Sequence, residues 1–154
     1  MARDPRETIA SIIVDYRQGQ IAKPDAVHVD RWARQFPSGV REPMLHEMAH
    51  ILARSYVTRQ QVIDFLTQVA SNKKLVGADP ATFWRGVRFL RLQTAGNSQR
   101  DLLALFDAVL QELYGFDTAG CGAKPSLYVY LDDGIFSGGR TKSDLVRWVE
   151  GDAP

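Results

Sequence analysis

One segment constrains the fold of this chain more than any other: residues 127–141 run from an apolar stretch through two carboxylates into a loop of small residues. The stretch that begins at Leu127 has no alternating polar face, so it predicts a strand buried on both sides, as in a parallel sheet. Asp132 and Asp133 would then lie at the carboxyl end of that strand, where open α/β sheets bind ligands. An ordinary turn after an edge strand is the alternative, because Asp and Gly dominate turns.

The loop after the two acids has the composition of an anion site. Gly134, Gly138 and Gly139 can turn without Cβ clashes, so backbone N–H groups can approach an anion closely. Thr141 and Asp144 have the spacing of a capping box and predict the start of a helix. A phosphate held by this loop would therefore also face a helix N-terminus.

The first half of the chain has helical periodicity. We predict a helical subdomain over residues 1–76, with Asp25 capping one helix and Pro43 starting the next. Thr58 and Gln61 have capping-box spacing and predict a further helix start.

The second half, residues 77–154, has a different pattern. The latter part of 84–93 predicts a strand, and Ser98 with Asp101 predicts the cap of a helix that runs to Tyr114. The order is then strand, loop, helix, strand, acidic loop and helix, which is the beginning of a parallel sheet. We therefore predict the α+β or α/β class, with a helical subdomain followed by a partial parallel-sheet α/β unit.

Composition narrows the class of protein. With 45% hydrophobic residues, 24% charged residues and a net charge of +1, the chain is typical of globular proteins and carries no strong nucleic-acid or membrane signal. A single cysteine, Cys121, excludes an internal disulfide, and no N-terminal apolar stretch is long enough for a signal peptide. We therefore expect a cytoplasmic protein.

Residues 128–140 resemble the phosphoribosyl-pyrophosphate motif of type I phosphoribosyltransferases, in length and in the placement of Asp-Asp and Ser-Gly-Gly. The usual motif ends Thr-Gly-Gly-Thr; here Ser137 keeps a hydroxyl, Arg140 replaces the final hydroxyl residue, and Thr141 follows it. The resemblance implies that the acidic pair contacts the ribose hydroxyls and that residues 134–141 cradle the 5-phosphate.

Type I enzymes also have an earlier loop that binds pyrophosphate. By position this loop would be residues 93–99, with Gly96, Asn97, Ser98 and Gln99 as its candidate contacts. An ordinary strand-to-helix connection would explain the segment equally well. The resemblance also implies Mg²⁺ that bridges pyrophosphate and ribose oxygens and is bound chiefly through the substrate.

A narrower likeness rests on the helical prefix, on one dipeptide at the start of the long helix and on the acidic motif. These residues resemble the phosphoribosyltransferase-like (PRTase-CE type) proteins of bacterial conflict and retron-associated defence loci: Trp32, Gln35, Phe36, Ser98-Gln99 and residues 132–138. The likeness implies an antiviral defence role. Type I enzymes add further strands after the motif, so we expect a truncated domain whose activity needs the complete enzyme. A protein partner or a second copy would then complete the sheet.

A competing motif lies in the helical half. His46-Glu47-Met48-Ala49-His50 matches H-E-x-x-H, in which two histidines at i and i+4 bind one Zn²⁺ and Glu47 acts as general base. A catalytic zinc needs a third protein ligand, and His28 is the one remaining histidine. Two histidines on the polar side of a helix also explain the pattern. A small zinc metallopeptidase therefore stays an alternative, as does a non-catalytic phosphate-sugar-binding or interaction module.

Overall fold

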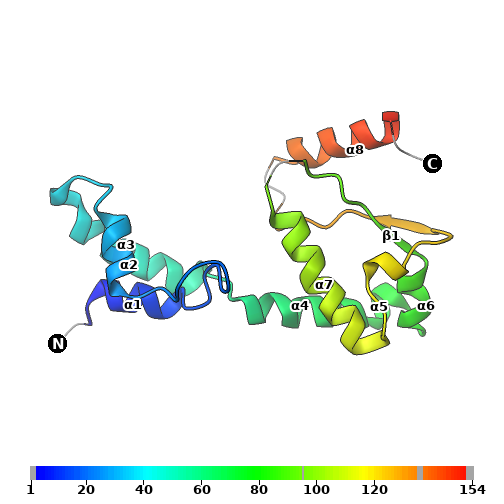
Figure 1. Ribbon diagram of the computed structural model, residues 1–154, viewed down its shortest axis with the longest axis horizontal. Coiled ribbons are helices and arrows are strands. Elements are labelled where there is room, and N and C mark those ends of the chain that lie inside the picture. The colour runs from blue at the N-terminus through cyan, green and yellow to red at the C-terminus, as the bar shows by residue number, and fades with distance from the viewer. Residues whose placement is uncertain (1–2, 95, 135–136, 152–154) are drawn as a thin grey trace. The chain divides into compact units, whose positions relative to one another are not determined.

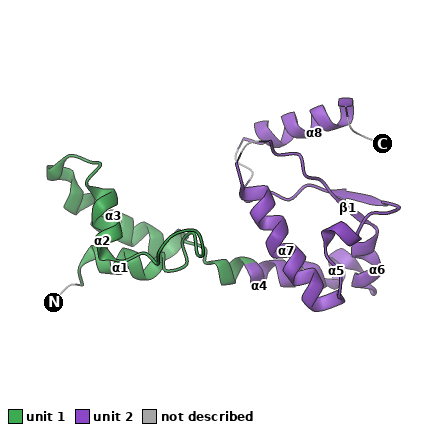
Figure 2. Ribbon diagram, in the orientation of Figure 1, with its two compact units in different colours: residues 1–62 green, residues 63–154 purple. Residues whose placement is uncertain are grey.

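The computed structural model describes residues 3–94, 96–134 and 137–151. The chain divides into two compact units, residues 1–62 and residues 63–154 (Figure 2). The division falls within one helix, α4 (Arg59–Ser71). Within the described residues, no helix combines the length and the apolar character needed to cross a membrane.

Unit 1 is built from three helices, α1 (Pro5–Ile12), α2 (Ala26–Ala33) and α3 (Ser38–Ser55) (Figure 1). Helix α1 packs against both α2 and α3. The buried core that they share is small, because two of its members are alanines: Ile9, Ala10, Val29, Ala33 and Leu45.

Arg6 is the polar link among the three helices of unit 1. Its Nε donates to Asp30 of α2 at 3.2 Å, and its guanidinium also donates to Glu42 of α3. These hydrogen bonds from Arg6 hold the pKa of both carboxyl groups below their usual range. The small apolar core of unit 1 is therefore supplemented by ion pairs at its edge.

Two of the predicted helix starts in the first half are confirmed and one is wrong. The Asp25 carboxylate accepts the His28 N–H at 2.7 Å and caps α2. Thr58 and Gln61 form a reciprocal capping box, in which the Thr58 N–H donates to Oε1 of Gln61 at 2.8 Å and the Gln61 N–H donates to Oγ1 of Thr58 at 3.2 Å. Pro43, however, does not start a helix: α3 begins at Ser38, and Pro43 lies inside it.

Unit 2 combines helices with a small parallel sheet, which confirms the predicted fold class. Val87 pairs with Leu127 and Phe89 pairs with Val129. After α4, its elements in chain order are α5 (Lys73–Val76), α6 (Pro80–Arg85), β1 (Val87–Phe89), α7 (Ser98–Tyr114), the 3₁₀ helix η1 (Thr118–Gly120), β2 (Leu127–Val129) and α8 (Gly139–Gly151).

An aromatic cluster anchors the sheet of unit 2. The Trp84 ring stacks on Phe89 with centroids 5.9 Å apart and meets Phe106 edge-on at 5.1 Å. Its Nε1 donates to the Ala70 carbonyl at 2.8 Å, and the Tyr114 hydroxyl donates to the same carbonyl at 3.0 Å. Residues from α4, α6, β1 and α7 therefore meet at one point beneath the sheet.

The second strand is less buried than its apolar sequence predicts. Leu127 is 43% exposed, and Tyr128 and Val129 are half-buried. The described residues form a two-stranded sheet, so β2 is an edge strand. Helix α8 covers part of it, because the Trp148 ring lies 5.1 Å from that of Tyr128. The prediction of a strand buried on both faces is therefore wrong.

The capping boxes predicted for the two helices that follow the strands are also wrong. Ser98 is the first residue of α7, and no side-chain hydrogen bond caps that helix at Asn97. Helix α8 begins at Gly139, so Thr141 lies inside its first turn. Asp144 is buried and bonds to another part of the unit. In α8, a tertiary contact occupies the Asp144 side chain that the local spacing assigned to the cap, whereas in α7 Asp101 is exposed and pairs with the adjacent Arg100.

Candidate functional site

The carboxyl ends of β1 and β2 lead into two loops at the same edge of the sheet. The Leu90 N–H donates to the Val129 carbonyl at 2.8 Å, so the two strands are still paired where the loops begin. The first loop leads into α7 and the second into α8, and the two helices begin close to each other (Figure 1). This is the edge at which parallel sheets bind ligands.

Gln99 fixes the spacing between the two loops. Its side chain is buried, with 3% of the residue exposed. Its Oε1 accepts the backbone N–H groups of Leu92 and Gln93 at 2.9 and 3.1 Å, and its Nε2 donates to the Leu131 carbonyl at 3.1 Å. Gln99 therefore acts on the site by positioning both loops.

A second polar link runs from the first loop to α8. The Tyr130 hydroxyl accepts a hydrogen bond from Nε2 of Gln93 at 3.1 Å and donates to Oδ2 of Asp144 at 3.0 Å. The hydroxyl of Ser98 lies 3.5 Å from Oε1 of Gln93. Burial, together with the Asp144 carboxylate, raises the pKa of Tyr130. This network holds the phenol protonated and ties α8 to the loop after β1.

The two loops enclose a cavity of about 170 Å³, the loop cleft. Its lining residues come from both predicted loops: Ser98, Asp132, Asp133, Gly134, Ser137, Gly138, Arg140 and Thr141. Both members of the acidic pair and most of the predicted phosphate loop are thus brought together with Ser98. Gly139, at the start of α8, is not among the lining residues.

A second cavity, of about 210 Å³, is lined by other residues of the first loop and of α7, two of them arginines. It is lined by Arg91, Gln93, Gly96, Gln99, Arg100 and Leu103. Of the predicted pyrophosphate loop, Gly96 and Gln99 line this basic cavity, Ser98 lines the loop cleft, and Asn97 lines neither. Sequence reasoning missed Arg91 and Arg100, although basic residues on either side of a small-residue loop are a signal for anion binding.

The acidic wall of the loop cleft begins with a tight turn. The Asp133 N–H donates to Oδ1 of Asp132 at 3.0 Å, so the Asp132 carboxylate is partly used in holding the turn. Asp133 is exposed. Carboxylate oxygens at this position can accept hydrogen bonds from sugar hydroxyls or share a hard cation with a bound phosphate.

The opposite wall is suited to an anion. Gly138 has a φ of +72°, a conformation that favours glycine, and the Gly139 N–H donates to Oγ of Ser137 at 3.3 Å. Arg140 extends toward the first loop, since a Cβ added at Gly96 would lie 3.9 Å from its Nη2. The loop cleft therefore has carboxylates on one side, and a guanidinium and a helix N-terminus on the other.

The H-E-x-x-H motif lies in unit 1. His46, Glu47 and His50 are exposed on α3, and Nδ1 of His50 is 2.9 Å from the Arg54 guanidinium. In the part of the chain that the structure describes, no three His, Cys, Asp or Glu side chains are grouped to hold a metal ion. The zinc alternative stays a prediction, and the described residues add no third ligand to it.

Comparison with known proteins supports the resemblance seen in the acidic motif. The model of the PRTase-CE family matches residues 29–153, a range that includes both loops, the sheet and α8. Searches of the curated proteins and of the solved structures found no match. The match covers well over half of the chain, so this protein belongs to the PRTase-CE family of phosphoribosyltransferase-like proteins.

Proposed function

We propose that the loop cleft binds 5-phosphoribosyl pyrophosphate or a related sugar phosphate. The observation that carries the proposal is the convergence of Ser98, the acidic pair and most of the predicted phosphate loop on one cavity. The family supports a sugar phosphate as the class of ligand. A role in antiviral defence, which the sequence resemblance implies, is part of the same proposal.

Each wall of the loop cleft suits one end of such a ligand. Asp132 and Asp133 would accept hydrogen bonds from the two ribose hydroxyls. The 5-phosphate would lie against the loop of residues 137–139, the start of α8 and the Arg140 guanidinium. Backbone N–H groups and one arginine are sufficient to bind a small anion.

The basic cavity would take the pyrophosphate end. Arg91 and Arg100 supply positive charge there, and Gly96, with a φ of +85°, lets the backbone approach closely. Carboxylates beside phosphate oxygens suit Mg²⁺, which would neutralise charge on the departing pyrophosphate. The proposed reaction breaks the bond between C1 of the ribose and pyrophosphate, and transfers the sugar to a base-like acceptor or to water.

Calorimetric titration of the chain with 5-phosphoribosyl pyrophosphate, with and without Mg²⁺, tests the proposal. We expect saturable binding that depends on Mg²⁺, and about tenfold or greater weakening in Asp133→Asn, because a charged hydrogen-bond partner is lost. Glu112→Gln is the control, since Glu112 is exposed on α7 and lines neither cavity. Binding that is indifferent to both Mg²⁺ and Asp133→Asn would contradict the proposal.

A pyrophosphate-release assay separates an enzyme from the non-catalytic alternative. Release at a rate that falls in Asp133→Asn would indicate transfer or hydrolysis. Binding without release would indicate a sugar-phosphate-binding module.

A further inference from the structure

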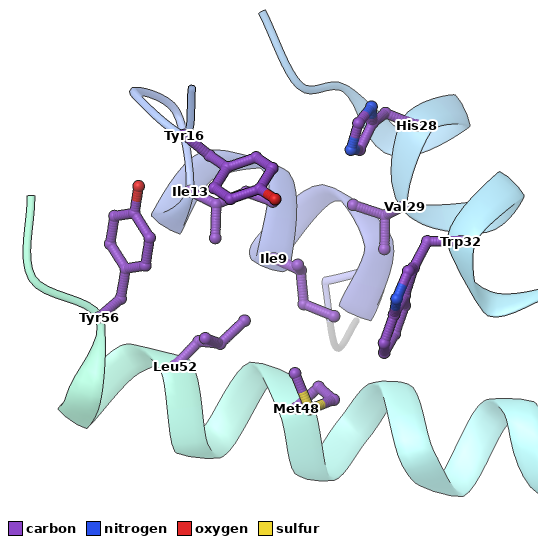
Figure 3. A pocket seen from close by; sticks show the side chains of 9 residues that line it. All are labelled: Ile9, Ile13, Tyr16, His28, Val29, Trp32, Met48, Leu52 and Tyr56. Atoms are coloured by element: carbon purple, nitrogen blue, oxygen red, sulfur yellow. The ribbon is translucent and has the colours of Figure 1, made fainter. Parts of the chain in front are cut away.

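Unit 1 contains a pocket that the proposed function does not use. It lies among α1, α2 and α3, and nine residues line a volume of about 400 Å³ (Figure 3). Ile9, Ile13 and Leu52 give it an aliphatic wall, and Tyr16, Trp32 and Tyr56 surround it with aromatic rings. Ile9, Ile13, Tyr16 and His28 precede the range that matches the family, so this unit 1 pocket is built in part by residues outside the match.

The lining of the unit 1 pocket excludes charge. None of the nine residues is Asp, Glu, Lys or Arg. A charged ligand would lose its hydration there without gaining an ion pair, which is costly. Tyr56 belongs to the scaffold, because its hydroxyl donates to Oδ1 of Asp15 at 2.7 Å and that carboxylate also accepts the Arg59 N–H.

The polar groups at the pocket lie on partly exposed residues, so a ligand can reach them: Tyr16 is 45% and Trp32 37% exposed. The Tyr16 hydroxyl and the His28 ring turn toward the space between α1 and α2 (Figure 3). Within the described residues, neither these groups nor Nε1 of Trp32 makes a hydrogen bond. An apolar hollow with a few convergent polar groups is the usual form of a small-molecule site.

We propose that the unit 1 pocket binds an uncharged, flat heteroaromatic molecule. The volume of about 400 Å³ lies within the range of about 300–1,000 Å³ for such sites and equals the space of about a dozen waters at ~30 Å³ each. A bicyclic ring system fits that volume. Its faces would pack against Trp32 and Tyr16, and a ring nitrogen would accept a hydrogen bond from the Tyr16 hydroxyl.

The test uses the full chain labelled with ¹³C at isoleucine and methionine methyl groups, with quinoline as the probe. We expect saturable shifts at Ile9, Ile13 and Met48, which line the pocket, and none at Ile51 or Met44, which do not. Quinoline-4-carboxylate, the charged analogue, should bind at least about tenfold more weakly, because its carboxylate has no partner in the pocket. Absence of saturable shifts, or equal binding of the two probes, would overturn the proposal.

Two neighbouring residues of α3 give matched variants. Leu52→Phe fills the pocket and should abolish quinoline binding, whereas Ile51→Phe adds the same ring at a 51% exposed position outside it and should leave binding unchanged. Tyr16→Phe keeps the ring and removes the hydroxyl, so it should weaken quinoline about two- to tenfold. Native methyl spectra in the absence of probe establish that each variant is folded.

Unchanged quinoline binding in both Leu52→Phe and Tyr16→Phe would overturn the proposal. So would concentration-dependent shifts of the Ile9 and Met48 methyls without any probe, because they would assign the pocket to a second copy of the chain.

Discussion

The two units form their cavities in different ways. In unit 1 the pocket is a gap between the side chains of three helices, and its surface is apolar because packed helix faces are apolar. In unit 2 the loop cleft lies where two parallel strands end, so small residues, backbone N–H groups and charged side chains form its walls. Helix packing thus selects for the shape and apolarity of a ligand, while strand ends select for its charge.

The two units also differ in how their cavities are supported. The helices of unit 1 rest on five small or medium side chains and on the ion pairs of Arg6. In unit 2 an aromatic cluster anchors the sheet, and the hydrogen bonds of Gln99 and Tyr130 hold the two loops. We therefore expect substitutions in unit 2 to affect stability and the loop cleft together.

The largest effect is expected from Phe106→Ala. Phe106 is 1% exposed and contacts the rings of both Trp84 and Phe89, so its removal leaves a large cavity. The free energy of unfolding of unit 2 should fall by about 3–5 kcal/mol. Chemical denaturation followed by tryptophan fluorescence measures this, while the Ile9 and Met48 methyl signals report on unit 1. A loss below about 1 kcal/mol, or equal damage to the unit 1 signals, would contradict the picture of two separate cores.

Gln99→Leu should follow in size. It leaves the Leu92 and Gln93 N–H groups and the Leu131 carbonyl without the buried partner that joins the two loops. We expect a cost of about 1–3 kcal/mol in unfolding free energy, measured by denaturation, and weaker ligand binding in the loop cleft. Gln111→Leu, an exposed change on the same helix, is the control and should change neither quantity. Equal effects of the two variants would show that Gln99 does not set the loop spacing.

Tyr130→Phe should have a smaller effect of the same kind. It removes the hydroxyl that joins Gln93 to the buried Asp144 and should cost about 1 kcal/mol in unfolding free energy. Tyr128→Phe is the matched control, because Tyr128 packs its ring against Trp148 and its hydroxyl makes no hydrogen bond within the described residues. Thermal unfolding of the two variants should separate them, and a larger loss in Tyr128→Phe would argue against the network.

The smallest effect concerns pH and unit 1. The Tyr56 hydroxyl, and then the Arg59 N–H, hold the pKa of Asp15 below its usual range. A carboxyl whose pKa is depressed by folding stabilises the protein above its unfolded value of about 3.9, and this contribution is lost as the pH falls through the folded pKa. Asp15→Asn should therefore be less stable than the natural chain near neutral pH, with a shallower loss of stability in acid. Parallel acid-denaturation curves for the two proteins would contradict this.

Features governed by near neighbours were predictable from the sequence. The strand, the acidic pair and the glycine loop follow one another within residues 127–141, and the caps at Asp25 and Thr58 join residues three positions apart. The predicted cap at Thr141 was wrong because α8 begins before it and its partner Asp144 bonds to Tyr130, which is distant in the sequence. The predicted cap at Ser98 was wrong because Ser98 is already the first residue of α7.

Features that depend on assembly were out of reach of the sequence. The exposure of β2 follows from its place at the edge of the two-stranded sheet that the described residues form, and this is not encoded in the five apolar residues from Leu127. The basic cavity joins Arg91 and Arg100 across a loop, and the unit 1 pocket joins α1 to α3. Each appears once the helices and strands are packed.

The central claim, that unit 2 binds a sugar phosphate at the loop cleft, is tested most directly with ¹⁵N-glycine labelling. The chain has 12 glycines, of which Gly134 and Gly138 line the loop cleft and Gly96 lines the basic cavity, whereas Gly19 and Gly39 lie in unit 1. On addition of 5-phosphoribosyl pyrophosphate with Mg²⁺, we predict saturable shifts of Gly96, Gly134 and Gly138, with Gly19 and Gly39 unchanged. Shifts confined to the unit 1 glycines, or no saturable shift at Gly134 and Gly138, would contradict it.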